Sequence, residues 1–261
     1  MLKKVTKKIN QSKINLSPFP YLFIKDFINK ENLKSVVNSL PSFNEIYGKE
    51  IQYQSKSQTK KTVLPSSKIY KKLSKKKSFK DINFLFEKLK PVILKKFRDQ
   101  IKLHVKANFQ NSKLKYHSSF SIMKKGYKKS AHLDRRDHLI HMIFYPDSDA
   151  SKGGEICINS LKKHSKIYDI FPKVQDLKIS KKHKIKNNSC LIILNVPWAY
   201  HSVSPYYGKK DRIYFYMVYD FPISKSGSKL KNRKKGFNQN EFWNYKVEVK
   251  SIKRKKVFLS E

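Results

Sequence analysis

Short strand-like segments separated by turn residues occupy the second half of this 261-residue chain. Each segment alternates apolar and polar side chains or is nearly continuously apolar or aromatic. The clearest four are 113–124, 139–145, 190–196 and 212–221. Shorter β-like pieces are 154–158, 167–170 and 174–179. Gly126 and the stretch 146–149 supply turns. Several short strands at this spacing predict an all-β sandwich or barrel core, at about 112–222.

Helical periodicity precedes this β-rich region. Four apolar residues that share one helical face are Leu33, Val36, Val37 and Leu40. Asn29 is the candidate N-cap of this helix, and a second apolar stripe runs over 82–101. Ser78, with an acidic residue three positions later, resembles a capping box at its start, and Pro91 is expected to kink or divide it. Helices followed by a β core predict the α+β class.

The length suits one large domain or two small ones. Residues 1–15 are basic and polar and are expected to form a loose tail. We place one domain at 16–223 and a basic C-terminal extension at 224–261, with a small packed element at 242–249. Segment 47–77 is polar and lysine-rich and is interpreted as a loop with a short strand or turn.

His132 and Asp134 lie two positions apart. On an extended backbone residues i and i+2 point to the same side, so both side chains can reach one ion. An imidazole with a carboxylate is the ligand mix of a non-heme Fe(II) centre, which needs a second histidine and keeps open positions. His201, between an apolar and an aromatic strand, is the candidate. Rival ligands without the two-residue spacing are Asp137, His138 and His141.

Four elements in one order resemble a known family. The His132/Asp134 pair is followed by Gly153-Gly154-Glu155, then by His201, then by Arg212 eleven positions later. This order resembles the Fe(II)/2-oxoglutarate-dependent oxygenases, especially the prolyl 4-hydroxylase-like branch. Segment 17–27, with a strand at 21–24, resembles the usual entry to such domains. The resemblance implies a double-stranded β-helix core of jelly-roll or cupin type with supporting N-terminal helices.

The resemblance also implies roles for individual residues. His132, Asp134 and His201 would hold Fe(II), and Arg212 would pair with the remote carboxylate of 2-oxoglutarate. Tyr214, on the same strand face as Arg212, either adds a hydroxyl bond to that carboxylate or packs in the core. The implied reaction consumes O₂, hydroxylates a C–H bond and releases succinate and CO₂, and ascorbate is a further candidate cofactor. A prolyl residue in a peptide is the suggested substrate; small-molecule and anionic substrates stay open.

Four residues near the predicted ligands are candidates for the substrate pocket. They are Arg135, Arg136, Trp198 and Tyr200. The arginines could hold an anionic substrate or be solvated, and the aromatic rings could wall the pocket or only pack. Lys209 and Lys210 could replace Arg212 if the register differs, although a planar guanidinium suits a buried carboxylate better.

The formal net charge of +40 suggests an anionic partner such as nucleic acid. However, six of the 59 basic residues are arginine and the other 53 are lysine. Abundant Lys, Ile and Asn are what an AT-rich coding genome produces, and phosphate recognition more often uses arginine. A non-catalytic nucleic-acid-binding protein on a relic oxygenase core is therefore the alternative function. The intact ligand set speaks against it.

Cys157 and Cys190 make no disulfide framework and lack the paired spacing of a zinc site. The basic N-terminus is not followed by the apolar stretch of a signal peptide, and no apolar run approaches the roughly eighteen residues of a membrane span. These features predict a reducing, cytoplasmic setting. They leave the oligomeric state open.

Overall fold

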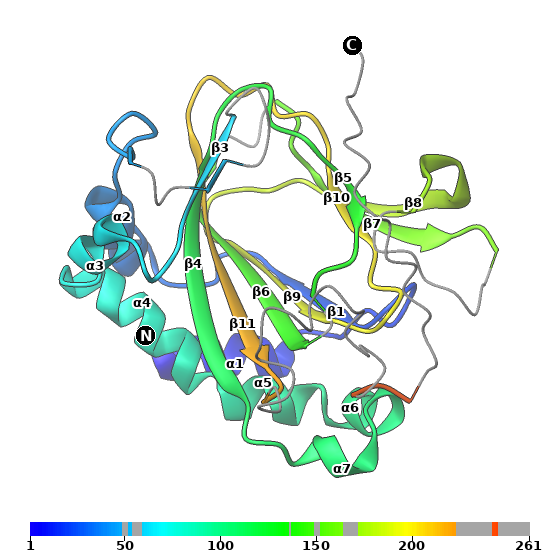
Figure 1. The fold of residues 1–261 in the computed structure, drawn as a ribbon. Coiled ribbons are helices and arrows are strands. Elements are labelled where there is room, and N and C mark those ends of the chain that lie inside the picture. The colour runs from blue at the N-terminus through cyan, green and yellow to red at the C-terminus, as the bar shows by residue number, and fades with distance from the viewer. Residues whose placement is uncertain are drawn as a thin grey trace.

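Two antiparallel β-sheets form the centre of the computed structural model, and the helices gather on the outer side of the larger sheet (Figure 1). The structure describes residues 1–48, 52–53, 59–135, 137–148, 152–163, 172–222 and 242–244. The expected α+β class with a double-stranded β-helix core is confirmed.

The larger sheet has seven strands, antiparallel throughout. Their order is β1 (Tyr21–Ile24), β9 (Ser189–Leu194), β6 (His138–Asp147), β11 (Arg212–Asp220), β4 (Lys115–Met123), β3 (Lys60–Val63) and β2 (Gln52–Tyr53). Phe144 of β6 packs on Phe27 and Phe86, with ring centroids 5.7 and 5.9 Å away. Side chains alternate along a strand, so His141 of β6 lies on the opposite, inner face. This inner face is turned towards the smaller sheet.

The smaller sheet has the order β5 (Lys129–His132), β10 (His201–Val203), β7 (Ile156–Leu161) and β8 (Leu177–His183). A short 3₁₀ turn, η1 (Val174–Asp176), leads into β8. Strand β10 lies between β5 and β7, and His201 pairs with both His132 and Ile158. The pairing of His201 with His132 joins residues 69 positions apart in the chain (201 − 132).

The helices supply the apolar layer behind the larger sheet. They are α2 (Lys30–Ser39), α3 (Lys68–Leu73), α4 (Lys77–Lys88), α5 (Lys90–Lys96), α6 (Arg98–His104) and α7 (Ala107–Gln110). Asn29 caps α2 as predicted, because its side-chain oxygen accepts from the Asn32 N–H at 3.2 Å. The core is built largely from aromatic rings, as where Phe79 of α4 lies 5.3 Å from Phe215 of β11.

Three details of this helical region differ from expectation. The predicted division at Pro91 is confirmed, but a further break at Phe97 separates α5 from α6. The capping box at Ser78 is wrong: Lys76 is the N-cap of α4, no side chain caps it, and Ser78 lies within the first turn. The segment interpreted as a loop contains α3, whose N-cap Ser67 accepts from the Tyr70 N–H.

The prediction of a loose tail at 1–15 is wrong. Residues Leu2–Gln11 form α1, which packs against α5. Val5 and Ile9 are completely buried, at 1% and 0% exposure. Residues four apart share one helical face, so these two side chains are enough to anchor a helix whose other face is lysine-rich.

A short C-terminal piece packs on the domain. Trp243 forms a β-bridge with Val105, and the ring of Phe242 stacks on Phe221 at 4.5 Å. The β-like piece expected at 167–170, and the extension 224–261 apart from 242–244, lie outside the described residues. Within the described ranges no helix has the length and apolar character needed to cross a bilayer.

Candidate metal centre

The predicted ligands come from paired strands of the smaller sheet and the loop that follows one of them. His132 ends β5, His201 begins β10, and their ring centroids lie 4.3 Å apart. Asp134 follows β5, with Oδ1 3.5 Å from His132 Nε2 and Oδ2 3.7 Å from His201 Nε2. One ligand atom from each residue lies within 4.8 Å of the others, so a single ion could bind all three.

Backbone carbonyls orient both imidazoles. Nδ1 of His132 lies 2.9 Å from the Ser130 carbonyl oxygen, and Nδ1 of His201 lies 3.1 Å from that of Ala199. A carbonyl oxygen only accepts, so Nδ1 carries the proton in each ring. The lone pair of a neutral ring is then on Nε2, the nitrogen that faces Asp134. Metal-binding histidines are commonly held in this way.

Burial sets the charge states of the centre. His132 and His201 are 5% and 3% exposed. Burial, reinforced by His132, lowers the pKa of His201 well below its ordinary value. Burial raises the pKa of Asp134, but the imidazoles of His141 and His201 outweigh it and hold that pKa well below its usual range. The centre therefore offers a neutral imidazole and an ionised carboxylate at neutral pH, the forms that bind metals.

Two residues of the larger sheet also meet Asp134. Tyr216, which sequence reasoning missed, donates its hydroxyl to Asp134 Oδ2 at 2.9 Å. Its position on the same strand face as Arg212 was the available signal. His141, expected only as a rival ligand, is fully buried with Nδ1 3.3 Å from the same oxygen. Neither of its ring nitrogens has a hydrogen-bond partner within the described part of the chain.

A second group of possible ligands, Asp137, His138 and Asp220, is already hydrogen-bonded. Nδ1 of His138 lies 2.5 Å from Asp220 Oδ1, and both carboxylate oxygens of Asp137 accept from Arg135. The other oxygen of Asp220 is 3.4 Å from His117 Nε2. These contacts give the group a structural role at the start of β6.

Arg212 is completely buried on the inner face of the larger sheet. Its Nη1 donates to the Gly154 carbonyl, and its Nη2 to that of Gly153 at 3.2 Å. Its Cζ lies 4.3 Å from the Tyr206 ring centroid and 5.9 Å from that of Tyr145. The Gly-Gly pair found in the sequence thus forms part of the guanidinium's binding surface.

The other candidate residues have varied positions. Tyr214 is buried, and its ring lies 5.6 Å from that of Tyr145. Arg135 is held by Asp137. Trp198 donates to the Pro18 carbonyl and contacts the ring of His104 edge-on, while Tyr200 packs with Leu133 and Leu177. Among the described contacts, Trp198 and Tyr200 thus occupy packing positions. Arg136 lies outside the described residues.

Comparison with solved structures identifies the architecture. A prolyl-4-hydroxylase from Pseudomonas putida is similar with a TM-score of 0.51 and 11% identity, over 85% of this chain and 100% of that one. A prolyl hydroxylase from Trichoplax adhaerens, in complex with a hypoxia inducible factor oxygen degradation domain peptide fragment, has a TM-score of 0.53 and 12% identity, over 87% and 96%. The chain has the prolyl 4-hydroxylase fold. No family model and no curated protein matches its sequence.

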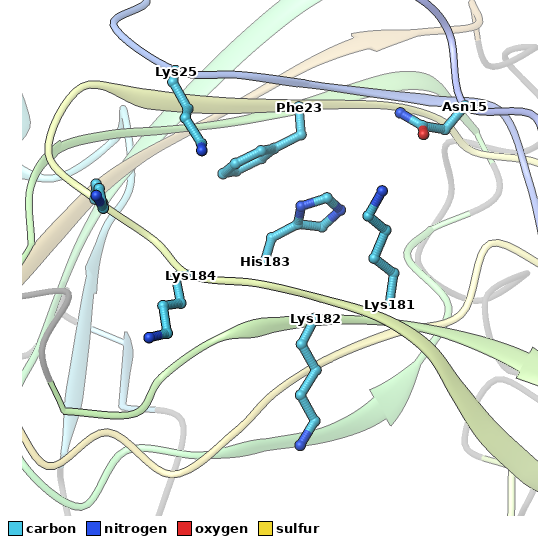
Figure 2. A pocket seen from close by; sticks show the side chains of 8 residues that line it. Asn15, Phe23, Lys25, Lys181, Lys182, His183 and Lys184 are labelled. Carbon is cyan, nitrogen blue, oxygen red and sulfur yellow. The ribbon is translucent and has the colours of Figure 1, made fainter.

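This prolyl 4-hydroxylase fold also carries a lysine-lined pocket of about 490 Å³ where β8 approaches β1 (Figure 2). The rings of Phe23 and His183 lie 4.4 Å apart within it. Figure 2 shows Lys25 and Lys181 extending towards these rings, whereas Lys182 points away. Both strands are sheet edges, and lysines on edge strands discourage pairing with other chains. The pocket contains none of the predicted metal ligands.

Proposed function

We propose that this protein is an Fe(II)- and 2-oxoglutarate-dependent oxygenase that hydroxylates its substrate. The observation that carries the proposal is the convergence of His132, Asp134 and His201, with both Nε2 atoms aimed at the carboxylate. Two imidazoles and one carboxylate on one side of an ion leave positions for a bidentate keto acid and O₂. The donor set thus fits the metal that the fold suggests.

Each residue has a defined part in this scheme. The bound iron would couple decarboxylation of 2-oxoglutarate, to succinate and CO₂, with hydroxylation of a substrate C–H bond. His132 and His201 would hold the metal through Nε2, with the Ser130 and Ala199 carbonyls fixing their tautomers. Tyr216 would hold Asp134 through its hydroxyl, so that the carboxylate presents a constant orientation to the metal.

Arg212 would bind the remote carboxylate of 2-oxoglutarate. Its guanidinium is buried, and a charge-assisted pair with a carboxylate is strongest where water is excluded. Gly153 and Gly154 orient two of its donor groups from one side. Tyr214 lies two positions along the same face and is the second candidate contact for that carboxylate.

A prolyl residue in a peptide is one proposed substrate, since one structurally similar protein was solved with a peptide. We place the protein in the cytoplasm, with ascorbate as an auxiliary reductant, and treat 16–223 as the oxygenase domain. The alternative is a nucleic-acid-binding protein on a relic core. This alternative predicts nucleic-acid binding that weakens steeply as the salt concentration rises. Such binding would not require His132, Asp134 or His201.

The deciding experiment is anaerobic titration of the metal-free protein with Fe(II) and 2-oxoglutarate, following the visible metal-to-ligand charge-transfer band. We expect the band in wild type and in His117→Ala, which alters an exposed histidine. It should be absent in His201→Ala and should require at least about tenfold more 2-oxoglutarate in Arg212→Ala. Absence of the band from wild type with both additions in excess would refute the oxygenase proposal.

A further inference from the structure

Two lysines lie near the candidate metal centre, one from each sheet. Lys60 of β3 is 3% exposed. It pairs with Met123 of β4, which pairs in turn with Arg212 of β11, so all three side chains share the inner face. Lys61 lies on the opposite face, where its ammonium donates to the Phe43 and Ile46 carbonyls at 2.7 Å each. The two neighbouring lysines thus have different surroundings.

A β-bulge determines the direction of the second lysine side chain, that of Lys129 in β5. In the β5–β10 pair His201 lies opposite His132, but Val203 lies opposite Lys129, so β5 holds one extra residue. His201 and Val203 share a face, and their partners therefore do too, although Lys129 and His132 are three positions apart. Lys129 is partly buried and is directed to the same side as the metal-binding imidazoles.

Lys60 lies beside two aromatic rings, and the charge of Asp134 acts on both lysines. The ammonium of Lys60 lies 5.0 Å from the ring centroid of Tyr214 and 5.7 Å from that of Tyr127. Burial lowers the pKa of Lys60 to about 7 and lowers that of Lys129, while the carboxylate of Asp134 raises both. Burying ammonium groups is costly unless an anion compensates. The partly buried ammonium of Lys129, beside the metal centre, therefore calls for an anion.

A count of the charges in the proposed active site shows that one positive charge lacks a counter-charge. In the proposed function a divalent metal and Arg212 carry positive charges that Asp134 and dianionic 2-oxoglutarate cancel. Metal binding also engages Asp134, the carboxylate that acts on Lys129. Lys129 then has no counter-charge among these groups, because the co-substrate carboxylates are assigned to the metal and to Arg212. A further anion would complete the site.

We propose that Lys129, together with Lys60, is a recognition subsite for an anionic group of the substrate, a carboxylate or a phosphate ester. The inference rests on the proposed function and names its substrate class. The phenol rings of Tyr127 and Tyr214 beside Lys60 suit such a group, since a phenol can donate to an anion while its ring packs on a lysine stem.

The test uses the full chain loaded with Mn(II) and 2-oxoglutarate, whose binding is measured first by calorimetry. The probes are N-acetyl amides of aspartate, glutamate and phosphoserine beside those of asparagine, glutamine and serine. We expect at least one acidic probe to bind about tenfold or more tighter than its neutral counterpart. Lys129→Gln and Lys60→Met should abolish that preference, whereas Lys128→Gln, on the exposed neighbouring lysine, should keep it.

The aspartate and phosphoserine arms distinguish a carboxylate from a phosphate ester. A preference that survives Lys129→Gln overturns the subsite, as does equal binding of every acidic and neutral pair. If Lys129→Gln instead weakens 2-oxoglutarate about tenfold, the lysine serves the co-substrate and the substrate assignment fails. If Mn(II) and 2-oxoglutarate do not bind wild type at all, it is the proposed function that fails.

A second measurement is independent of the choice of probes. Crystals of the loaded protein soaked in bromide should show anomalous density between the ammonium groups of Lys60 and Lys129. The same soak of Lys129→Gln should show none there. Wild-type crystals without such density would contradict the subsite even if a probe were found to bind elsewhere.

Discussion

A Cβ atom on residue 154 would lie 2.7 Å from Cζ of Arg212 and closer still to one of its terminal nitrogens. Gly154 therefore leaves the space that the buried guanidinium occupies, and it also has a positive φ of 71°. Two independent requirements, a left-handed backbone and the absence of a side chain, exclude other residues here. The glycine motif and the distant arginine form one structural unit.

Gly154→Ala should displace the Arg212 guanidinium and weaken 2-oxoglutarate binding by at least about tenfold, while Mn(II) affinity stays unchanged. Gly48→Ala is the matched control, because Gly48 also has a positive φ but an added Cβ there would meet nothing within 4 Å. Calorimetric titration of both variants separates backbone strain from the clash. Equal 2-oxoglutarate affinities in the two variants would argue against the link.

Tyr216→Phe removes the hydroxyl that holds Asp134. We expect metal affinity to fall about tenfold, because partners that orient a ligand typically contribute that much. Tyr207→Phe, on an exposed tyrosine, should leave affinity unchanged. Competition for Mn(II) against a chelator measures both. Unchanged affinity in Tyr216→Phe would mean that the Asp134 carboxylate keeps its orientation without the hydroxyl.

His141→Leu tests the rival ligand. Its buried imidazole makes no hydrogen bond within the described residues but lies 3.3 Å from Asp134 Oδ2, so these opposing effects should keep the change in stability of the metal-free protein within about 1 kcal/mol. Mn(II) should still bind, in contrast to His201→Leu, where we expect binding to be lost. Urea unfolding and metal titration are the two measurements. Loss of metal binding in His141→Leu would make His141 a ligand.

His183 should make stability depend on pH. Burial, helped by the ammonium groups of Lys181 and Lys25, lowers the pKa of His183 to about 4. Between the unfolded value of about 6.5 and this value, the unfolded chain binds more protons. Stability should therefore fall as pH drops through that window, by at most about 1.4 kcal/mol per pH unit from this residue. His183→Gln should flatten the dependence of the urea-unfolding free energy on pH, and an unchanged dependence would contradict this role of His183.

Ile9→Ala should cost about 2–4 kcal/mol of unfolding free energy, because its side chain is fully buried between α1 and the domain. Lys7→Ala, on the exposed face of the same helix, should change it by less than about 0.5 kcal/mol. Thermal and chemical unfolding give both values. If Ile9→Ala left the unfolding free energy unchanged, the N-terminal segment would be a loose tail and not a packed helix.

Local sequence patterns predicted the elements whose signals are themselves local. Alternation over 113–124 and the apolar run at 190–196 became β4 and β9, and Asn29 caps α2. Helix α1 was not predicted, because two apolar residues in a lysine-rich stretch give only a weak helical pattern. The helix is stabilised by packing on the rest of the domain, which the local sequence does not show. The roles of Tyr216 and Lys129 depend on contacts between the two sheets and on a bulge, neither of which any single segment encodes.

The extra residue in β5 has a consequence for how the site can change. In a regular strand a residue three positions before His132 would point to the opposite face, so it is the bulge that brings the Lys129 side chain to the side of the imidazoles. The charge that the centre presents to a bound molecule is therefore set by the local geometry of β5 as well as by residue identity. A substitution that straightened β5 without shortening it would turn Lys129 away from a bound molecule without altering one metal ligand.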